Sequence, residues 1–284
     1  MRAKIDMTIS QFIYQALAED TGSGDHTSLA CVDPELTGKA ILKVKDTGII
    51  AGIELAQLII NQVDSRINLN KFIEDGTAVK PGDIAFELEG PEQKILLAER
   101  LILNCMQRMS GIATVTHNYV EAVQGTKAKI LDTRKTTPLN RDIEKWAVRI
   151  GGGFNHRKGL YDMILIKDNH IDYCGGIEAA IEKVTAYLIE KELDLKVEIE
   201  ARSMDDVKLI CEIGNVNRIM LDNFTPELLA EAVMYIKKAY ETEASGGITL
   251  VTVRRYAETG VDFISVGALT HSAVSLDLSL KAAK

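Results

Sequence analysis

Cationic side chains gather in one stretch of a chain that is acidic overall. The sequence has 33 lysines and arginines against 41 aspartates and glutamates, which gives a formal net charge of -8. The stretch from Asp132 to His170 is the exception, and inside it lie Arg134, Lys135, Arg141, Lys145, Arg149, His156, Arg157, Lys158 and Lys167. Guanidinium and ammonium groups bind phosphates and carboxylates. Their concentration here indicates a site for a small and highly anionic substrate.

Several of these cations stand directly after short apolar runs. Residues 130–131 precede the segment 132–135, and residues 164–166 precede the segment 167–170. An unbroken apolar run of this kind is typical of a buried parallel strand. Parallel α/β sheets bind their ligands beyond the carboxyl ends of the strands. We therefore expect the cations to meet at one rim of such a sheet.

Length and composition exclude several classes of protein. At 284 residues, with 46% hydrophobic and 26% charged residues, the chain is typical of a globular protein of one or two domains. Its acidic balance disfavours nucleic acid as a partner. No run approaches the ~20 apolar residues of a membrane span, and the first residues lack the apolar core of a signal peptide. The four cysteines are scattered without a CxxC pair, which predicts reduced thiols in a cytoplasmic protein.

The chain up to about residue 110 mixes helical and strand-like segments. Residues 9–18 and 95–109 have helical periodicity, whereas residues 38–44 and 84–88 show the alternation of strands. A turn signal at Pro81 and Gly82 precedes the second strand. We predict a separate N-terminal α/β domain.

From about residue 111 onward, apolar runs alternate with helical segments. The predicted strands are 129–131, 163–166, 196–199, 218–221, 240–243 and 262–266, and the predicted helices between them include 176–190, 204–212 and 226–239. The alternation indicates parallel βα units. A repeat of about 20 to 25 residues favours a compact barrel over an open sheet, although either architecture accommodates the pattern.

The residues that follow the later predicted strands complete a consistent chemical set. They are Glu200, Asp222, Ser245, Gly246, Gly247, Gly267, Ala268 and Leu269. The glycines can offer bare N–H groups to a terminal phosphate, and the carboxylates can hold Mg²⁺, bind ribose hydroxyls or stabilise a developing cation. Each feature alone is common on protein surfaces, so the combination carries the argument. We further expect one of Glu198 and Glu200 to face the interior of the barrel and the other to face the helices.

Motifs along most of the chain closely resemble those of the nicotinate-nucleotide pyrophosphorylase family, also called quinolinate phosphoribosyltransferases. The matching segments are Glu99–Asn104, Ser110–Thr114, Asp132–Pro138, Gly151–Gly153, Asn155–Arg157, Leu165–His170, Leu221–Phe224 and Ala244–Ile248. The likeness runs from Glu19 to the C-terminus and keeps the order of the motifs, so the resemblance is specific.

The resemblance implies a type II phosphoribosyltransferase-like fold with two domains. An N-terminal α/β sandwich over residues 1–110 precedes an incomplete, seven-stranded α/β barrel over residues 111–271. A C-terminal helix over about residues 272–284 returns to the first domain. Because the pattern above contains six strands, a seventh is expected near Ala147–Ile150. The family also implies a homodimer with shared active sites, or a hexamer, in which Arg100 serves the neighbouring subunit.

The implied activity is that of a pentosyltransferase in NAD biosynthesis, located in the cytoplasm. Quinolinate reacts with phosphoribosyl pyrophosphate in the presence of Mg²⁺ and gives nicotinate mononucleotide, pyrophosphate and carbon dioxide. Both substrates carry several negative charges, which suits the cationic segment. The implied partners are these small molecules, without nucleic acid or membrane.

The resemblance also assigns roles to individual residues. Those implied at the quinolinate carboxylates and the nearby phosphate are Arg100, Arg134, His156, Arg157 and Lys167. Lys135 is placed at the phosphoribosyl diphosphate, and Glu200 and Asp222 at the ribose and its Mg²⁺-bound diphosphate; with Lys167 these three form the implied catalytic set. Those implied at the 5-phosphate are Ser245, Gly246, Gly247, Gly267, Ala268, Leu269 and His271.

Three alternative functions stay open at this point. One is a molybdenum-transport-associated paralogue of the same fold, which the intact segments 155–157 and 167–170 disfavour. The second is a nicotinate phosphoribosyltransferase, whose substrate has one carboxylate. The third is a non-catalytic phosphoribosyl-binding protein, which would not need Glu200 and Asp222. The chain departs from the family pattern after Pro138, where Leu139 and Asn140 replace the usual glycine and leave the role of Arg141 undefined.

Overall fold

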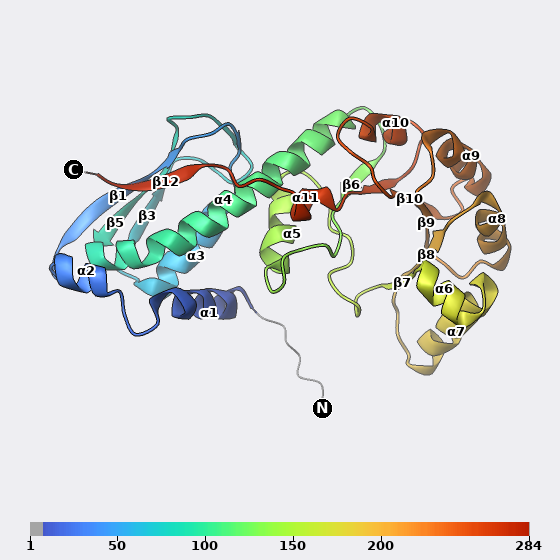
Figure 1. Cartoon of the computed structure of the whole chain (residues 1–284), viewed down its shortest axis with the longest axis horizontal. Coiled ribbons are helices and arrows are strands. Elements are labelled where there is room, and N and C mark those ends of the chain that lie inside the picture. Colours follow the sequence, from blue (N-terminus) through green and yellow to red (C-terminus); the bar gives the residue numbers. More distant parts are fainter. Residues whose placement is uncertain (1–7, 284) are drawn as a thin grey trace. The chain divides into compact units, whose positions relative to one another are not determined.

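The computed structural model describes residues 8–283 and divides into two compact units (Figure 1). The first unit is built from the described parts of Met1–Val115, Asp142–Gly151 and Ala273–Lys284, and the second from Thr116–Arg141 and Gly152–Ser272. Among the described residues, no helix combines the length and the apolar character needed to cross a bilayer.

The first unit contains a four-stranded antiparallel sheet in the order β12-β1-β5-β3, with a short β2-β4 ladder beside it. Its strands are β1 (Thr37–Val44), β2 (Gly48–Ile49), β3 (Asn68–Lys71), β4 (Ala78–Val79), β5 (Ile84–Pro91) and β12 (Leu278–Ala283). The helices wholly or mainly in this unit are α1 (Ile9–Thr21), α2 (His26–Cys31), α3 (Ile53–Val63), α4 (Glu92–Ala122) and α5 (Arg141–Ile150). Alternation along β5 buries Phe86 and Leu88, and α3 buries Leu55, Ile59 and Ile60. The predicted N-terminal α/β domain is thus built from these elements.

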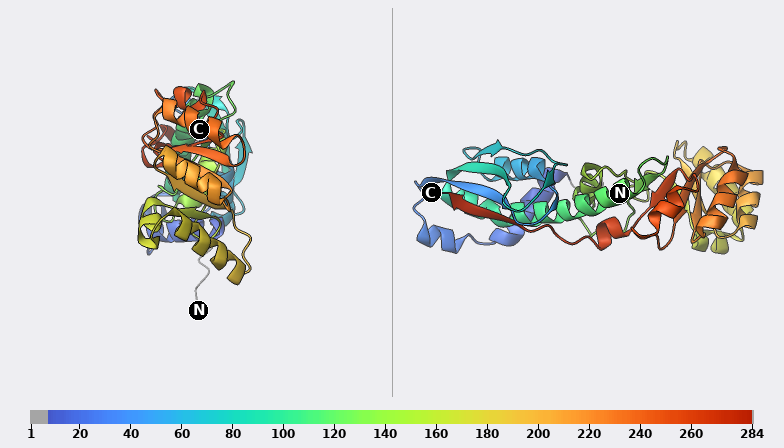
Figure 2. Two further views of the ribbon diagram at one scale, coloured as in Figure 1. Left: turned by 90° about the vertical axis from the view of Figure 1, so that its right-hand side faces the viewer. Right: turned by 90° about the horizontal axis from the view of Figure 1, so that it is seen from above.

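The C-terminal segment does return to the first unit, but it is not a helix. Residues 278–283 form strand β12, which pairs antiparallel with β1 from Val44↔Leu278 to Lys39↔Ala283 (Figures 1 and 2). The expectation of a helix over 272–284 is therefore wrong within the described residues. Leu278 and Leu280 are buried while Lys281 is exposed, so the segment has the alternation of a sheet edge rather than a helical stripe.

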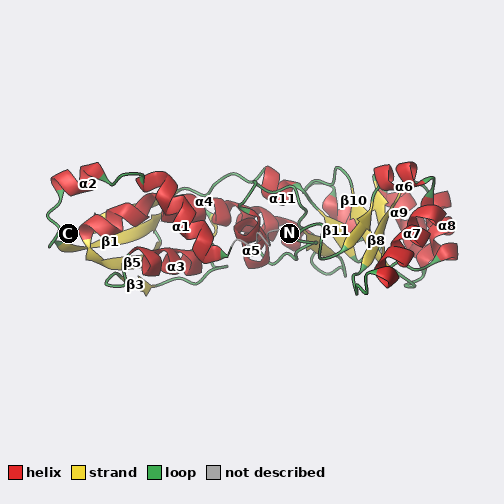
Figure 3. Cartoon of the chain, turned by 90° about the horizontal axis from the view of Figure 1, so that it is seen from below, coloured by secondary structure: helices red, strands yellow, loops and turns green. Residues whose placement is uncertain are grey.

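The second unit contains a six-stranded sheet in which all neighbouring strands run parallel. Its strands are β6 (Lys129–Leu131), β7 (Ile164–Ile166), β8 (Val197–Ala201), β9 (Arg218–Asp222), β10 (Glu241–Ser245) and β11 (Phe263–Ser265). Its helices are α6 (Asp168–Cys174), α7 (Ile177–Glu190), α8 (Met204–Ile213), α9 (Pro226–Ile236), α10 (Val253–Ala257) and α11 (Ala268–His271). Figure 3 shows α6 to α9 along the outer face of the sheet.

The strand order is that of a barrel rather than of a doubly wound sheet. From β7 to β11 each strand lies beside the next one in the chain, and β11 then lies beside β6. A doubly wound sheet would reverse direction at a switch point. In the described sheet β6 and β7 stay unpaired with each other, so the barrel is incomplete. This confirms the predicted α/β fold.

The structure contains six strands in this sheet, not seven. The segment Ala147–Ile150, where a seventh was expected, lies inside helix α5. The sheet instead gains a single residue beyond β6, because Phe154 forms an isolated parallel bridge with Leu131. The Phe154 N–H donates to the Ile130 carbonyl at 2.8 Å. The family resemblance implied the seventh strand, whereas the local sequence here forms the last turn of a helix that ends at Ile150.

Leu139 occupies a backbone conformation that favours glycine. The Asn140 N–H donates to the Thr137 carbonyl at 3.1 Å, which closes a four-residue turn with Pro138 and Leu139 in the middle. Leu139 has φ = 64°. Proline followed by a residue of positive φ is the pattern of a type II turn, in which glycine is preferred at the second central position. The turn therefore forms without the family's glycine, and Leu139 carries the strain.

Replacing Leu139 with glycine is expected to stabilise the protein by about 0.5–1 kcal/mol, because relief of the left-handed leucine outweighs the extra freedom of glycine in the unfolded chain. Little apolar burial is lost, since Leu139 is 75% exposed. Leu160, 73% exposed and without a positive φ, provides the matched control. Thermal unfolding should show a higher midpoint for L139G and an unchanged or lower one for L160G; equal shifts would rule out backbone strain.

Candidate active site

The carboxyl ends of the parallel strands surround a cavity of about 870 Å³ in the second unit. Of the residues singled out in the sequence, those lining it are Arg134, Lys135, His156, Arg157, Lys167, Glu200, Asp222, Ser245, Gly246, Gly247, Gly267, Ala268 and His271. Leu269 is fully buried and does not line the cavity. Arg100 lies on α4 in the first unit with an exposed side chain. The expected meeting of cations at one rim is therefore observed for five residues of the stretch, but Arg141 and Lys158 belong to the same unit and do not line the cavity.

The loop that carries His156 and Arg157 is held by a buried carboxylate at the end of β6. Asp132 is fully buried and accepts hydrogen bonds from Asn155 Nδ2 at 2.5 Å and from the His156 N–H at 2.8 Å. The Arg157 guanidinium donates to the Met163 carbonyl at 3.3 Å. Burial lowers the pKa of Arg157, and the positive charge of Arg134 lowers it further. The guanidinium groups of Arg134 and Arg157 thus lie close together in a part of the cavity lining that is partly shielded from water.

Lys167 and Glu200 form a charged pair in the lining of the same cavity. Lys167 Nζ lies 2.8 Å from Glu200 Oε1, and the Asp168 N–H donates to Glu200 Oε2 at 3.0 Å. Both residues project from strand ends, since Lys167 follows β7 and Glu200 is near the end of β8. The Glu200 side chain is 7% exposed while that of Lys167 is 47% exposed. The lysine therefore reaches into the cavity with a buried carboxylate behind it.

Glu200 and Asp222 provide the oxygen donors that a divalent cation requires. Burial raises the pKa of Asp222, and the negative charge of Glu200 raises it further. Two carboxylates that repel each other at a cavity wall favour a cation between them or beside them. Carboxylate oxygens are the ligands that Mg²⁺ prefers in proteins. The residues present therefore fit the magnesium that the family resemblance implies.

A glycine loop after β10 forms the third side of the cavity. Gly246 has φ = 101°, and a Cβ atom there would collide with the side chain of Asn223 and approach its backbone nitrogen to 2.9 Å. Only glycine fits this approach. Gly267, at the start of α11, lets the Lys135 side chain lie against the backbone, because a Cβ atom would be 3.0 Å from Lys135 Cδ. Exposed backbone N–H groups in such loops suit a phosphate.

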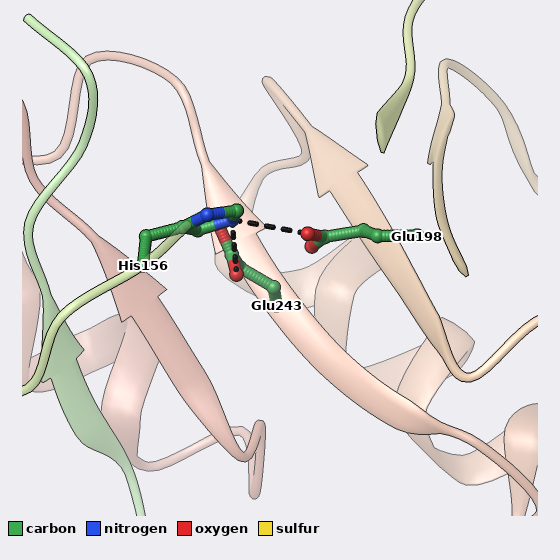
Figure 4. Close-up of side chains that lie close together, drawn as sticks. All are labelled: His156, Glu198 and Glu243. Atoms are coloured by element: carbon green, nitrogen blue, oxygen red, sulfur yellow. Dashed lines mark ion pairs between the residues drawn. The ribbon is translucent and has the colours of Figure 1, made fainter. Parts of the chain in front are cut away.

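Beneath the cavity lies a buried group of His156, Glu198 and Glu243 (Figure 4). His156 Nε2 is 3.0 Å from Glu198 Oε2 and 3.4 Å from Glu243 Oε2. Arg218 Nη1 is 3.0 Å from Glu243 Oε2. The expectation that Glu198 and Glu200 face opposite ways is wrong, because residues two apart on a strand point to the same side. Both carboxylates face the barrel interior.

The protonation of His156 argues against a metal ion in this group. Burial by itself lowers the pKa of His156, but the two carboxylates outweigh burial and raise it to about 9. His156 Nδ1 lies 2.7 Å from the main-chain nitrogen of Arg157. A pKa of about 9 favours the imidazolium at neutral pH, and in that form Nε2 carries a proton that faces the carboxylates. A metal ion at Nε2 would have to displace that proton, so we assign none here.

Sequence reasoning considered Glu198 only for its orientation and missed the buried group that it forms with Glu243. Both are fully buried, and each lies within a strand rather than after it. The signal was present, because an acidic residue inside a buried parallel strand requires a cationic partner. The search considered only residues that follow the strands, so it did not include acidic residues within them. Arg218, at the start of β9, is the partner that the same reasoning would have found.

The comparisons with known proteins agree with this architecture. Residues 25–110 match the family model "Quinolinate phosphoribosyl transferase, N-terminal domain", and residues 112–281 match the model of the C-terminal domain. The chain is 45% identical over 281 residues to the chloroplastic nicotinate-nucleotide pyrophosphorylase [carboxylating] of Arabidopsis thaliana, covering 94% of this chain and 80% of the relative. It is 43% identical over 288 residues to the mitochondrial quinolinate phosphoribosyltransferase [decarboxylating] 2 of Nicotiana glauca, covering 96% and 82%.

Among solved structures, the crystal structure of NadC from Streptococcus pyogenes superposes with a TM-score of 0.91 at 36% identity and covers 100% of both chains. An incomplete parallel barrel with a cationic, glycine-edged cavity is the architecture of a phosphoribosyl-transferring enzyme. Within that class, the matched domain models and relatives show that the chain belongs to the quinolinate phosphoribosyl transferase family.

Proposed function

We propose that this protein transfers the phosphoribosyl group of phosphoribosyl pyrophosphate to quinolinate with decarboxylation, and so forms nicotinate mononucleotide for NAD biosynthesis. One observation carries the proposal: Arg134, His156, Arg157 and Lys167 line the same cavity as the carboxylate Glu200. Such a cavity suits two anionic reactants of which one develops positive charge. The named activities of the relatives support the same reaction.

The cations bring together two reactants that would otherwise repel each other. Arg134, Arg157 and Lys167, which line one cavity, hold the two carboxylates of quinolinate. Lys135 and the glycine loop after β10 hold the phosphates of the second substrate. Because both anions are bound and oriented in one site, their reaction no longer depends on a collision in solution and becomes effectively unimolecular.

The bond changes then follow from charge. The ribose C1–oxygen bond breaks, pyrophosphate departs with the electron pair, and oxocarbenium character develops on the ribose. Glu200 and Asp222 stabilise that positive charge electrostatically. The pyridine nitrogen forms the new bond to C1 and becomes cationic. Loss of the neighbouring carboxylate as carbon dioxide leaves a carbanion beside this nitrogen, which stabilises it until a proton from solvent replaces the carboxylate.

Magnesium belongs to this proposal as the implied metal. Glu200 and Asp222 would hold it, and when bound it supplies positive charge to the diphosphate that leaves. The assembly is proposed to be a homodimer in which Arg100 serves the site of the neighbouring subunit. The described cysteines are all free, which supports a reducing compartment such as the cytoplasm.

The direct test is incubation of the protein with quinolinate, phosphoribosyl pyrophosphate and Mg²⁺. We expect equal amounts of nicotinate mononucleotide and carbon dioxide, measured by chromatography and by release of label from carboxyl-labelled quinolinate. Chelation with EDTA should abolish both, and added Mg²⁺ should restore them. Nicotinate in place of quinolinate should give little product, because it lacks one of the two carboxylates.

The controls separate the proposed reaction from its alternatives. Binding of phosphoribosyl pyrophosphate without release of carbon dioxide would support a non-catalytic binding protein. Turnover of nicotinate at a rate equal to that of quinolinate would overturn the assignment of a dicarboxylate substrate. Full activity in EDTA would remove magnesium from the proposal while leaving the transfer reaction in place.

A further inference from the structure

Arg141 lies outside the cavity lining but connects the two loops that supply its arginines. Its Nε donates to Thr136 Oγ1 at 3.0 Å, its Nη1 to the Lys158 carbonyl at 2.9 Å and its Nη2 to the Arg134 carbonyl at 3.3 Å. The side chain is partly buried. Each of the three guanidinium nitrogens thus donates to a main-chain carbonyl or a hydroxyl oxygen, and none of these three contacts is an ion pair.

The two loops that Arg141 joins come from separate parts of the chain. The first, residues 133–141, carries Arg134 and Lys135, and the second, residues 155–163, carries His156 and Arg157. Among the hydrogen bonds described between side chain and main chain, those of Arg141 reach the carbonyls of Arg134 and of the residue directly after Arg157. Arg141 therefore links these two main-chain positions directly, further along both loops than the link that Asp132 makes to Asn155 and His156.

Electrostatics shows what such a connection works against. Burial lowers the pKa of Arg157 and the charge of Arg134 lowers it further, while Glu198, Asp162 and Glu200 act in the opposite direction. Like charges that are this close favour moving apart, and the nearby carboxylates offset part of that repulsion. Arg141 adds a third positive charge, but it aims its N–H groups at carbonyl oxygens and so restrains the backbone of both loops. The pair is held ready for an anion before one arrives.

We propose that Arg141 is a positioning residue that sets the spacing of Arg134 and Arg157, and through that spacing the fit of the site to two carboxylates on adjacent ring carbons. This inference rests on the proposed function. Three convergent hydrogen bonds fix a planar guanidinium, whereas a lysine ammonium at the same place reaches fewer of the acceptors at one time. The loops of the glycine-edged phosphate side do not contact Arg141 in the described hydrogen bonds.

The test is the separation of two Michaelis constants in the variants R141K and R141A. KM for quinolinate should rise about 10- to 100-fold in R141A and by a smaller factor in R141K, since a displacement of about 1 Å has effects of this size. KM for phosphoribosyl pyrophosphate should rise by a clearly smaller factor than KM for quinolinate, because Lys135 is the one proposed phosphate ligand on a loop that Arg141 holds. Guanidinium ion added to R141A at millimolar concentration should lower KM for quinolinate again.

Arg254 provides the matched control. It also joins two segments of the second unit, because its Nη1 donates to the Gln124 carbonyl at 2.7 Å while its Nε donates to Glu258 at 2.7 Å, and it does not line the cavity. R254A should leave both Michaelis constants unchanged and should not respond to guanidinium ion. Thermal unfolding is measured for every variant. If R141A fails to fold, the two Michaelis constants are compared in R141K instead.

Each outcome decides the inference. Equal increases in both Michaelis constants, or no increase in either, would show that Arg141 has only a general structural role. An increase that is clearly larger for quinolinate and that guanidinium ion reverses would support it. The unmodified protein is assayed first: if it forms no nicotinate mononucleotide, the proposed function fails, and calorimetric titration of quinolinate into both proteins still reveals whether Arg141 governs its binding.

Discussion

Replacing Lys167 with alanine is expected to lower kcat/KM by about 100- to 1,000-fold. Two effects act together. The variant loses a cation that faces the substrates, and it leaves the buried carboxylate of Glu200 without the ammonium group 2.8 Å away. Truncating one member of a close charge pair has effects of about 2–5 kcal/mol, which corresponds to this range of rates. Steady-state kinetics with both substrates varied measures the change.

Lys208 is the control for this prediction. It is 53% exposed, against 47% for Lys167, and it pairs with Asp205 at 3.3 Å on helix α8, away from the cavity lining. K208A should change kcat/KM by less than about twofold, as expected for an exposed ion pair. The double variant K167A/E200Q should be less impaired than the product of the single effects, because the two side chains act as a pair. Additive effects would mean that Lys167 and Glu200 function separately.

Replacing Arg218 with methionine is expected to lower the free energy of unfolding by about 3–5 kcal/mol, the range found when one partner of a buried ion pair is removed. Arg218 contacts Glu243 Oε2 and Glu241 Oε2, both at 3.0 Å, and its guanidinium lies 4.1 Å from the centre of the Phe263 ring. Without it, Glu243 and its neighbour Glu198 stay in the barrel interior with His156 as their remaining cationic neighbour in the group drawn in Figure 4. Urea denaturation followed by circular dichroism provides the measurement.

Two variants test the cause of this loss. R255A removes an arginine that is 65% exposed and pairs with Glu227, and it should change stability by no more than about 1 kcal/mol. Combining R218M with E243L should recover much of the stability, because an apolar pair replaces a stranded charge. If the double variant is as unstable as R218M alone, the loss comes from packing against Phe263 rather than from the buried carboxylate.

The sequence predicted the rim of the barrel more accurately than its interior. Lys167, Glu200 and Asp222 were found because polar residues placed just after apolar strands have a distinctive local pattern. Glu198 and Glu243 were not found, because their significance depends on which strands become neighbours, and β8 and β10 are separated by β9 in the sheet. Local patterns carry no information on such pairings.

The same limit explains the errors at the ends of the second unit's sheet. The segment Ala147–Ile150, where a seventh strand was expected from the family count, is the end of helix α5. The residue that extends the sheet, Phe154, makes a single bridge and has no strand pattern. In the first unit, the C-terminal residues were expected to be helical because the family resemblance implied a helix there, although alanine and leucine do favour one. Pairing with β1 overrides that propensity.

Strand β12 has a consequence for how the protein is made on the ribosome. Its partner β1 ends at Val44 and β12 begins at Leu278, so 278 − 44 = 234 positions separate them. At the usual speed of translation, about 10–50 s pass between the emergence of the two strands. During this interval nascent β1 exposes a row of free N–H and C=O groups, which is a template for pairing with another chain. Completion of the first unit's sheet therefore waits until β12 has been synthesised, and nascent chains shortened before Leu278 would be released with that edge uncovered.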